Sequence, residues 1–166
     1  RWRQLCIRDS PVAAFGGKRE IMNQIAPLGP VYQAGTLSGN PLSMASGLAM
    51  LSALESDKSF YENLGKRSQY LVNGIVSEAK AQNIPMTSNS VGGMFGLFFS
   101  SEEKVSNFSQ ASSCNIEFFK KFYNAMLKQG IYLAPSAYEA GFLSNAHSDE
   151  DLDKTINAAS AAFSSI

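Results

Sequence analysis

The segment 31–47, VYQAGTLSGNPLSMASG, is the feature that most constrains what this chain can fold into. Small and hydroxyl residues crowd positions 35–40, and Asn40 then precedes Pro41. Asn is typical of a helix N-cap, and Pro is typical of the first helical residue. The residues before it, 26–39, show no periodicity, and a loop of about 14 residues is uncommon in a compact protein and often functional. The sequence therefore predicts a long loop that ends where a helix begins.

Two interpretations of this loop stay open when only the residues are considered. Its glycines let the backbone approach a ligand closely, and the hydroxyls of Thr36 and Ser38 precede a helix N-terminus, which is the donor set that a phosphate needs. The loop is not a Walker motif, because no Lys follows the glycines, and its glycine spacing is wrong for a dinucleotide fingerprint. The alternative is an ordinary loop with a capped helix, and composition does not decide between the two.

The first 56 residues contain few regular elements. Residues 11–15, PVAAF, predict a short buried strand that ends at a Gly-Gly pair, and residues 18–25 predict one or two helical turns. The helix after Pro41 is rich in small residues, which lets it pack close to a neighbour. This part of the chain is typical of the tail of another domain.

From residue 57 onward the pattern predicts a layer of strands covered by helices. The expected elements are a helix over 57–82, a strand pair over 85–99 joined at Gly92-Gly93, a polar surface segment over 100–115, a helix over 116–129, a strand–loop–strand segment over 131–147 and a last helix from 148.

Caps and apolar stripes support these helices. Asp57 is expected to cap the first, Gly130 to end the second, and Ser148 with Asp151 to form a capping box at the last. The stripes at helical spacing are Phe60, Leu64, Leu71, Val72, Ile75, Val76 and Ala79 in the first, and Phe118, Phe119, Phe122, Met126 and Leu127 in the second.

Composition excludes several classes of function. The 166 residues include 14 basic and 14 acidic ones, so no electrostatic footprint for nucleic acid exists. No apolar run reaches the roughly 18–20 residues of a membrane span, and the first residues do not resemble a signal peptide. Cys6, Cys114 and His147 are too few for a disulfide framework or a zinc site, so a reduced cytoplasmic setting is expected. Ser136 and Ser144 have no base nearby in sequence, so a hydrolase triad finds no support.

Three separate motifs carry a resemblance to a known family. They are PVAAFGGKREIMNQIAPLGPVYQAGTLSGNPLSMASGLAML, VGGMFGLFF and GIYLAPSAYEAGFLSNAHSDEDLDKTI. In order and spacing they resemble the glutamate-1-semialdehyde 2,1-aminomutases, within the class III aminotransferases that use pyridoxal phosphate. The resemblance runs from Pro11 to Ile166. It implies an α/β fold of the aspartate aminotransferase type I, with the end of the large cofactor-binding domain over 11–56, a small C-terminal domain over 57–166 and a non-matching segment over 1–10.

The resemblance also implies roles for particular residues. The enzyme would be a homodimer that uses pyridoxal 5'-phosphate and pyridoxamine 5'-phosphate, and Gly35 and Thr36 would contact the cofactor phosphate of the partner subunit. Glu139, in APSAYEAGF, would lie at the active-site entrance, where it meets a substrate amino group or a basic side chain. His147 and Lys18 are expected to be structural, beside a helix cap and at a helix start.

The implied reaction is the isomerisation of glutamate-1-semialdehyde, a small-molecule substrate, to 5-aminolevulinate by intramolecular amino transfer, a step of tetrapyrrole (porphyrin) biosynthesis. Pyridoxamine phosphate would donate the amino group. The expected location is the cytoplasm, or the plastid stroma if the source is a plant or alga, with no nucleic-acid or membrane partner.

The chain departs from the family before Pro11. The family's Schiff-base lysine belongs to a segment like K-x-I-G-G-G-x-P, and counting back seven residues from Pro11 reaches Gln4. We therefore expect a C-terminal fragment that is inactive alone and headed by residues from a cloning junction, a gene truncation or a reading-frame error. Because a lone tail of the large domain leaves strand 11–15 without its neighbours, we also expect poor solubility or association through exposed apolar surface. Two alternatives remain: another class III aminotransferase that acts on an ω-amino substrate, and a non-catalytic remnant that binds a partner subunit.

Overall fold

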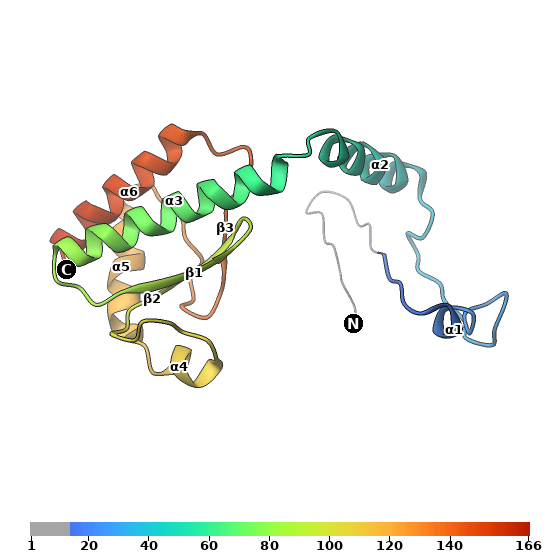
Figure 1. The fold of residues 1–166 in the computed structure, drawn as a ribbon, viewed down its shortest axis with the longest axis horizontal. Helices are drawn as coiled ribbons and strands as arrows, with labels where there is room; N and C mark the ends of the chain where they lie inside the picture. Colours follow the sequence, from blue (N-terminus) through green and yellow to red (C-terminus); the bar gives the residue numbers. More distant parts are fainter. Residues whose placement is uncertain (1–13) are drawn as a thin grey trace. The chain divides into compact units, whose positions relative to one another are not determined.

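The computed structural model describes residues 14–166, and Figure 1 shows its elements. The non-matching segment 1–10 and most of the predicted strand 11–15 lie outside the described residues; Ala14 and Phe15 are not in a strand. The chain divides into two compact units, one that ends at Lys58 and one over Ser59–Ile166, and each is described by itself.

The first unit is built from two helices and the loop between them. Helix α1 covers Arg19–Met22 and helix α2 covers Pro41–Ser56. Within the loop, Ile25 and Val31 form an isolated parallel bridge, in which the Ala26 amide donates to the Val31 carbonyl at 2.8 Å. Over residues 14–58 only Ser43 and Gly47 are buried, so this unit has little core within the part that the structure describes.

The second unit contains a three-stranded antiparallel sheet in the order β1-β2-β3. The strands are β1 (Thr87–Val91), β2 (Met94–Phe98) and β3 (Gly141–Phe142). A two-residue turn joins β1 to β2, because Val91 pairs with Met94, and Gly92 adopts a φ of 57° that glycine allows at little cost. This confirms the predicted hairpin.

Helices cover one face of this sheet (Figure 1). They are α3 (Phe60–Ala81), α5 (Ile116–Lys128) and α6 (Asp149–Ser164), and α3 packs on β1, β2 and α6. Along β2 the side chains alternate, so that Phe95 and Leu97 are buried while Met94 on the opposite face is exposed.

The core of the second unit is centred on Phe122, which is fully buried. Its ring stacks on Phe163 with centroids 4.9 Å apart and meets Phe99 at 5.4 Å. The predicted apolar stripes supply seven of the 16 residues of this buried cluster, but Leu127 is exposed. Leu127 lies about 100° around the helix from the buried Met126, which turns it toward solvent.

The predicted cap of α6 and the predicted end of α5 are confirmed. The Ser148 hydroxyl accepts a hydrogen bond from the Asp151 amide, and the Asp151 carboxylate accepts one from the Ser148 amide, which completes the capping box. These hydrogen bonds to Ser148 lower the pKa of the Asp151 carboxyl. After α5, Gly130 has a φ of 80°, and the next amide, that of Ile131, donates back to Met126.

Three predictions from sequence are wrong. Asp57 ends α2 instead of starting α3, whose N-cap position is Ser59. The polar segment 100–115 is more than a surface excursion, because it contains a short helix, α4 (Phe108–Ser112), and buries Val105 and Cys114. The strand expected after Gly130 does not form, since only Gly141 and Phe142 in this region pair with β2.

Candidate functional site

The loop before α2 is folded into two successive turns. The Ser38 amide donates to the Gly35 carbonyl at 2.9 Å, and the Asn40 amide donates to the Leu37 carbonyl at 3.1 Å. A Cβ atom at Gly35 would lie 2.9 Å from the Ser38 hydroxyl oxygen. Glycine lets this hydroxyl keep its position, and a larger residue would require the Ser38 side chain to move.

The start of α2 agrees with the prediction from sequence. The Asn40 side chain accepts a hydrogen bond from the Ser43 amide at 3.2 Å, and Pro41 is the first helical residue. The first turn carries no acidic residue, so the positive end of the helix dipole is not neutralised there.

The donors of Thr36 are available to a ligand. Thr36 is exposed, and over residues 14–166 neither its amide nor its hydroxyl takes part in a hydrogen bond. The segment 26–40 contains no charged side chain, so hydrogen bonds and the helix dipole are the means by which it would hold an anion. This donor set fits one side of a phosphate group.

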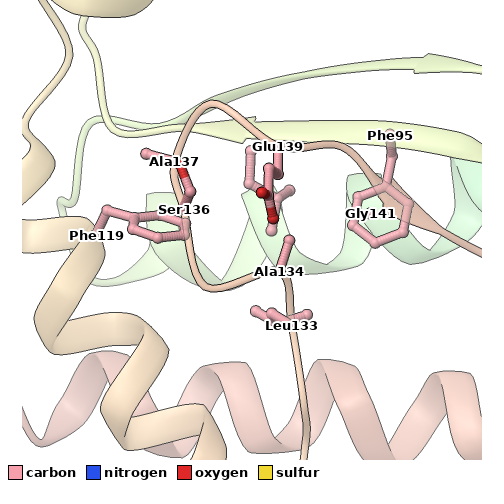
Figure 2. A pocket seen from close by; sticks show the side chains of 9 residues that line it. Phe95, Phe119, Leu133, Ala134, Ser136, Ala137, Glu139 and Gly141 are labelled. Carbon is pink, nitrogen blue, oxygen red and sulfur yellow. The ribbon is translucent and has the colours of Figure 1, made fainter.

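A second candidate site is the loop between α5 and β3, which carries Glu139. Ser136 forms its turn: its carbonyl accepts from the Glu139 amide at 3.1 Å, and its hydroxyl accepts from the Tyr138 amide at 3.2 Å. Figure 2 shows the Glu139 side chain extending into the space that the loop encloses, above Ala134.

Glu139 lines two cavities. The one inside the loop, against Phe95 and Phe119, measures about 20 Å³ and has room for little more than one water molecule. The other measures about 210 Å³ and lies against the outer face of the hairpin, where Met94 and Phe98 line it. Only the second has room for a small organic molecule, and its lining is mainly apolar.

The Glu139 carboxylate is the acidic group of this site. Among residues 59–166 it forms neither an ion pair nor a side-chain hydrogen bond. Asn89 and Ser90 also line the larger cavity, but the Asn89 amide group donates to the Val105 carbonyl and the Ser90 hydroxyl to Gln69. The Glu139 carboxylate is therefore suited to accept hydrogen bonds from a cationic group of a ligand.

The two other candidates lie beside helix starts. The His147 Nδ1 accepts from the Ser144 amide at 3.1 Å, and the His147 carbonyl accepts from Arg67 of α3. Lys18 occupies the N-cap position of α1. Over residues 14–166 no cluster of His, Cys, Asp and Glu is suited to a metal ion, and none of the helices there combines the length and apolar run that a membrane span requires.

Sequence reasoning missed the residues that shape the Glu139 loop. Ser136 was considered only as a nucleophile, although a Pro-Ser pair at 135–136 is a turn signal in its own right. Tyr138 lines the larger cavity, and its ring lies 5.8 Å from that of Phe108 in α4. No local sequence signal links these two residues, because they lie 30 positions apart.

The chain is similar to a known family and to several solved structures. The family described as aminotransferase class-III matches residues 10–162. An omega-transaminase from Sphaerobacter thermophilus superposes with a TM-score of 0.73 at 21% identity, over 90% of this chain and 34% of that one. A β-phenylalanine aminotransferase from Variovorax paradoxus gives 0.77 at 21% identity over the same shares.

A glutamate-1-semialdehyde-aminomutase from Pseudomonas aeruginosa PAO1 gives a TM-score of 0.67 at 17% identity, over 82% of this chain and 30% of that one. The chain thus spans about a third of the length of these structures. At such identities the likeness shows the fold alone, and it confirms the α/β fold class predicted from sequence.

Proposed function

Because the chain belongs to the class-III aminotransferase family, we propose that it forms the phosphate loop and small domain of a pyridoxal-phosphate enzyme. The support is the family match together with structural neighbours solved with this cofactor: a transaminase with PLP bound and an aminomutase variant in complex with PMP. When bound, the cofactor supplies an electron sink for chemistry at an amine-bearing carbon.

In this proposal Gly35 and Thr36 hold the cofactor phosphate of the partner subunit in a homodimer. Gly35 shapes the turn, and the Thr36 amide and hydroxyl donate to the phosphate oxygens. Hydrogen bonds to an ionised acceptor are about twice as strong as those between neutral groups. The donors of Thr36, which have no hydrogen-bond partner among residues 14–166, are the single observation that carries this proposal.

The finer proposal is that the enzyme is a glutamate-1-semialdehyde 2,1-aminomutase. It rests on the AGTLSGNP and APSAYEAGF motifs and on Glu139, whose carboxylate has no partner among residues 59–166 and borders a cavity of about 210 Å³. The carboxylate would orient the amino group of the substrate. An ω-amino transaminase remains the second candidate, because omega-transaminases are among the structural neighbours.

A paired-subunit assay tests the proposal. The chain is mixed with an aminomutase subunit that carries the Schiff-base lysine but whose own phosphate-loop threonine is replaced by valine. The wild-type chain should restore formation of 5-aminolevulinate from glutamate-1-semialdehyde, and so should Thr36→Ser, which keeps the hydroxyl. Thr36→Val should not. Equal restoration by Thr36→Val would contradict the role of Thr36.

The same assay separates the candidate functions. An aminomutase forms product without an external keto acid, because the amino group stays within the substrate. A dependence of amino transfer on added keto acid would identify the transaminase instead. Absence of both reactions, with formation of a mixed dimer, would favour the non-catalytic remnant.

A further inference from the structure

The segment 100–115 is fastened to the open edge of β1. The Thr87 hydroxyl donates to the Glu103 carbonyl at 3.0 Å, and the Asn89 amide group donates to the Val105 carbonyl at 2.6 Å. The Val105 side chain is also buried. The start of α4 is therefore fixed relative to the sheet, although its helix is short and surrounded by polar sequence.

Local hydrogen bonds then orient the first residue of α4. The Asn107 side chain accepts from the Gln110 amide at 3.0 Å, and the Gln110 side chain accepts from the Ser106 amide at 2.8 Å. This reciprocal cap places Phe108 at the helix start, with its ring 5.8 Å from that of Tyr138 and inclined by 39°.

The Glu139 loop and the 100–115 segment also border a common hollow. Ala137 lines a small hollow together with Ala111 and Cys114, and both of these residues belong to the 100–115 segment. Ala137 and Tyr138 both precede Glu139 directly in the turn that Ser136 closes. Hydrogen bonds thus join the edge of β1 to the segment that contains α4, and an aromatic pair joins α4 to the Glu139 loop.

We propose that Phe108 is a positioning residue, whose ring contact with Tyr138 holds the turn that directs the Glu139 carboxylate. The inference rests on the proposed role of Glu139 in substrate binding. The inference deepens that role, because it assigns the position of the Glu139 carboxylate to α4, a helix that contributes no reacting group. Aromatic pairs of this geometry stabilise beyond the area that they bury.

Amide exchange in the full chain tests this without any cofactor. The amides of Tyr138 and Glu139 are both hydrogen-bonded to Ser136, so their NMR exchange rates with water report on the turn. Phe108→Ala should raise both rates by about two- to tenfold. Phe108→Tyr keeps the ring and should restore the wild-type rates, which a general loss of stability would not explain.

Tyr61→Ala is the matched control. Tyr61 is exposed like Phe108 and also belongs to an aromatic pair, with Phe60 at 5.2 Å, but it lies on α3. Its substitution should leave the two exchange rates unchanged. Unchanged rates in Phe108→Ala, or an equal rise in Tyr61→Ala, would overturn the proposal. If Phe108→Ala does not fold, Phe108→Leu should give an intermediate rise, and wild-type rates in it would overturn the proposal equally.

The paired-subunit assay adds a functional result. Phe108→Ala should raise the KM for glutamate-1-semialdehyde while kcat changes little, because the substitution displaces a binding group and no reacting one. If exchange rises in Phe108→Ala but Glu139→Gln leaves KM unchanged, the positioning inference stands and the proposed role of Glu139 fails. The two claims are therefore separable.

Discussion

The two units of this protein differ in where their apolar side chains lie. In residues 59–166 a cluster of 16 of these side chains is buried around Phe122, whereas in residues 14–58 leucines of α2 such as Leu42 and Leu48 are exposed by 78% and 68%. Burial of apolar area is the main source of folding stability. The second unit is therefore stabilised by its own core, whereas the candidate phosphate loop lies in a unit that has little core among residues 14–58.

One substitution in each unit should give the greatest difference in the free energy of unfolding. Phe122→Ala should lower the free energy of unfolding by about 3–5 kcal/mol, because it removes a fully buried ring and leaves a cavity. Leu48→Ala should change it by less than about 0.5 kcal/mol. Urea denaturation followed by circular dichroism measures both, and similar losses in the two variants would break the comparison.

The two units can also be compared through their helix caps, since Asn40 and Asn115 are N-cap residues in different units. Each side chain accepts a hydrogen bond from an amide three residues on, in α2 and α5 respectively. Asn115→Ala should lower the unfolding free energy of the second unit by about 1 kcal/mol. Asn40→Ala should reduce helical ellipticity without moving that transition, and a shifted midpoint would show that the first unit contributes to the cooperative core.

Substitution of Ser68 tests whether a buried polar group in the core of the second unit lacks a hydrogen bond. Its hydroxyl is fully buried on α3 and is without a hydrogen-bond partner among the described residues. Ser68→Ala should therefore raise the unfolding free energy by about 1 kcal/mol. Ser160→Ala is the control, because it removes a hydrogen bond to Glu78 and should destabilise. Destabilisation by Ser68→Ala would mean that this hydroxyl has a partner in solution.

The smallest expected effect is a pH dependence at the start of α6. Hydrogen bonds from Ser148 lower the pKa of Asp151, so its folded-state pKa lies below its unfolded one. The stability that this provides is complete above the unfolded pKa, near 4, and is lost as the pH falls through the folded pKa. Asp151→Asn should lose less stability than the wild type between about pH 5 and pH 2; equal losses in thermal melts would contradict it.

Local chemistry explains which elements could be predicted from sequence. Asn40-Pro41 and the Ser148–Asp151 box specify their own helix starts through contacts within four residues, and both predictions are confirmed. The two glycines at 92–93 likewise specify the hairpin. Helix α4 could not be predicted, because its place depends on Val105 and on anchors along β1 that lie about 16 residues away.

The same limit applies to the candidate site. The sequence located Gly35, Thr36 and Glu139 through motifs, but the cavities beside Glu139 depend on packing between the loop and the hairpin. Asp57 shows a further cause of error. An acidic residue between two helices has the character of an N-cap for the second helix, but here it ends the first helix. Tertiary packing decides such helix boundaries, and the intrinsic propensity of a single residue does not specify it.

An NMR titration of the full chain measures whether the loop before α2 holds a cofactor phosphate. Pyridoxal 5'-phosphate should shift the Gly35 and Thr36 amide resonances, and pyridoxal, which lacks the phosphate, should not. Inorganic phosphate should reproduce the shift, and Thr36→Val should weaken it. Equal shifts with pyridoxal, or no response at these two amides while others move, would contradict the account.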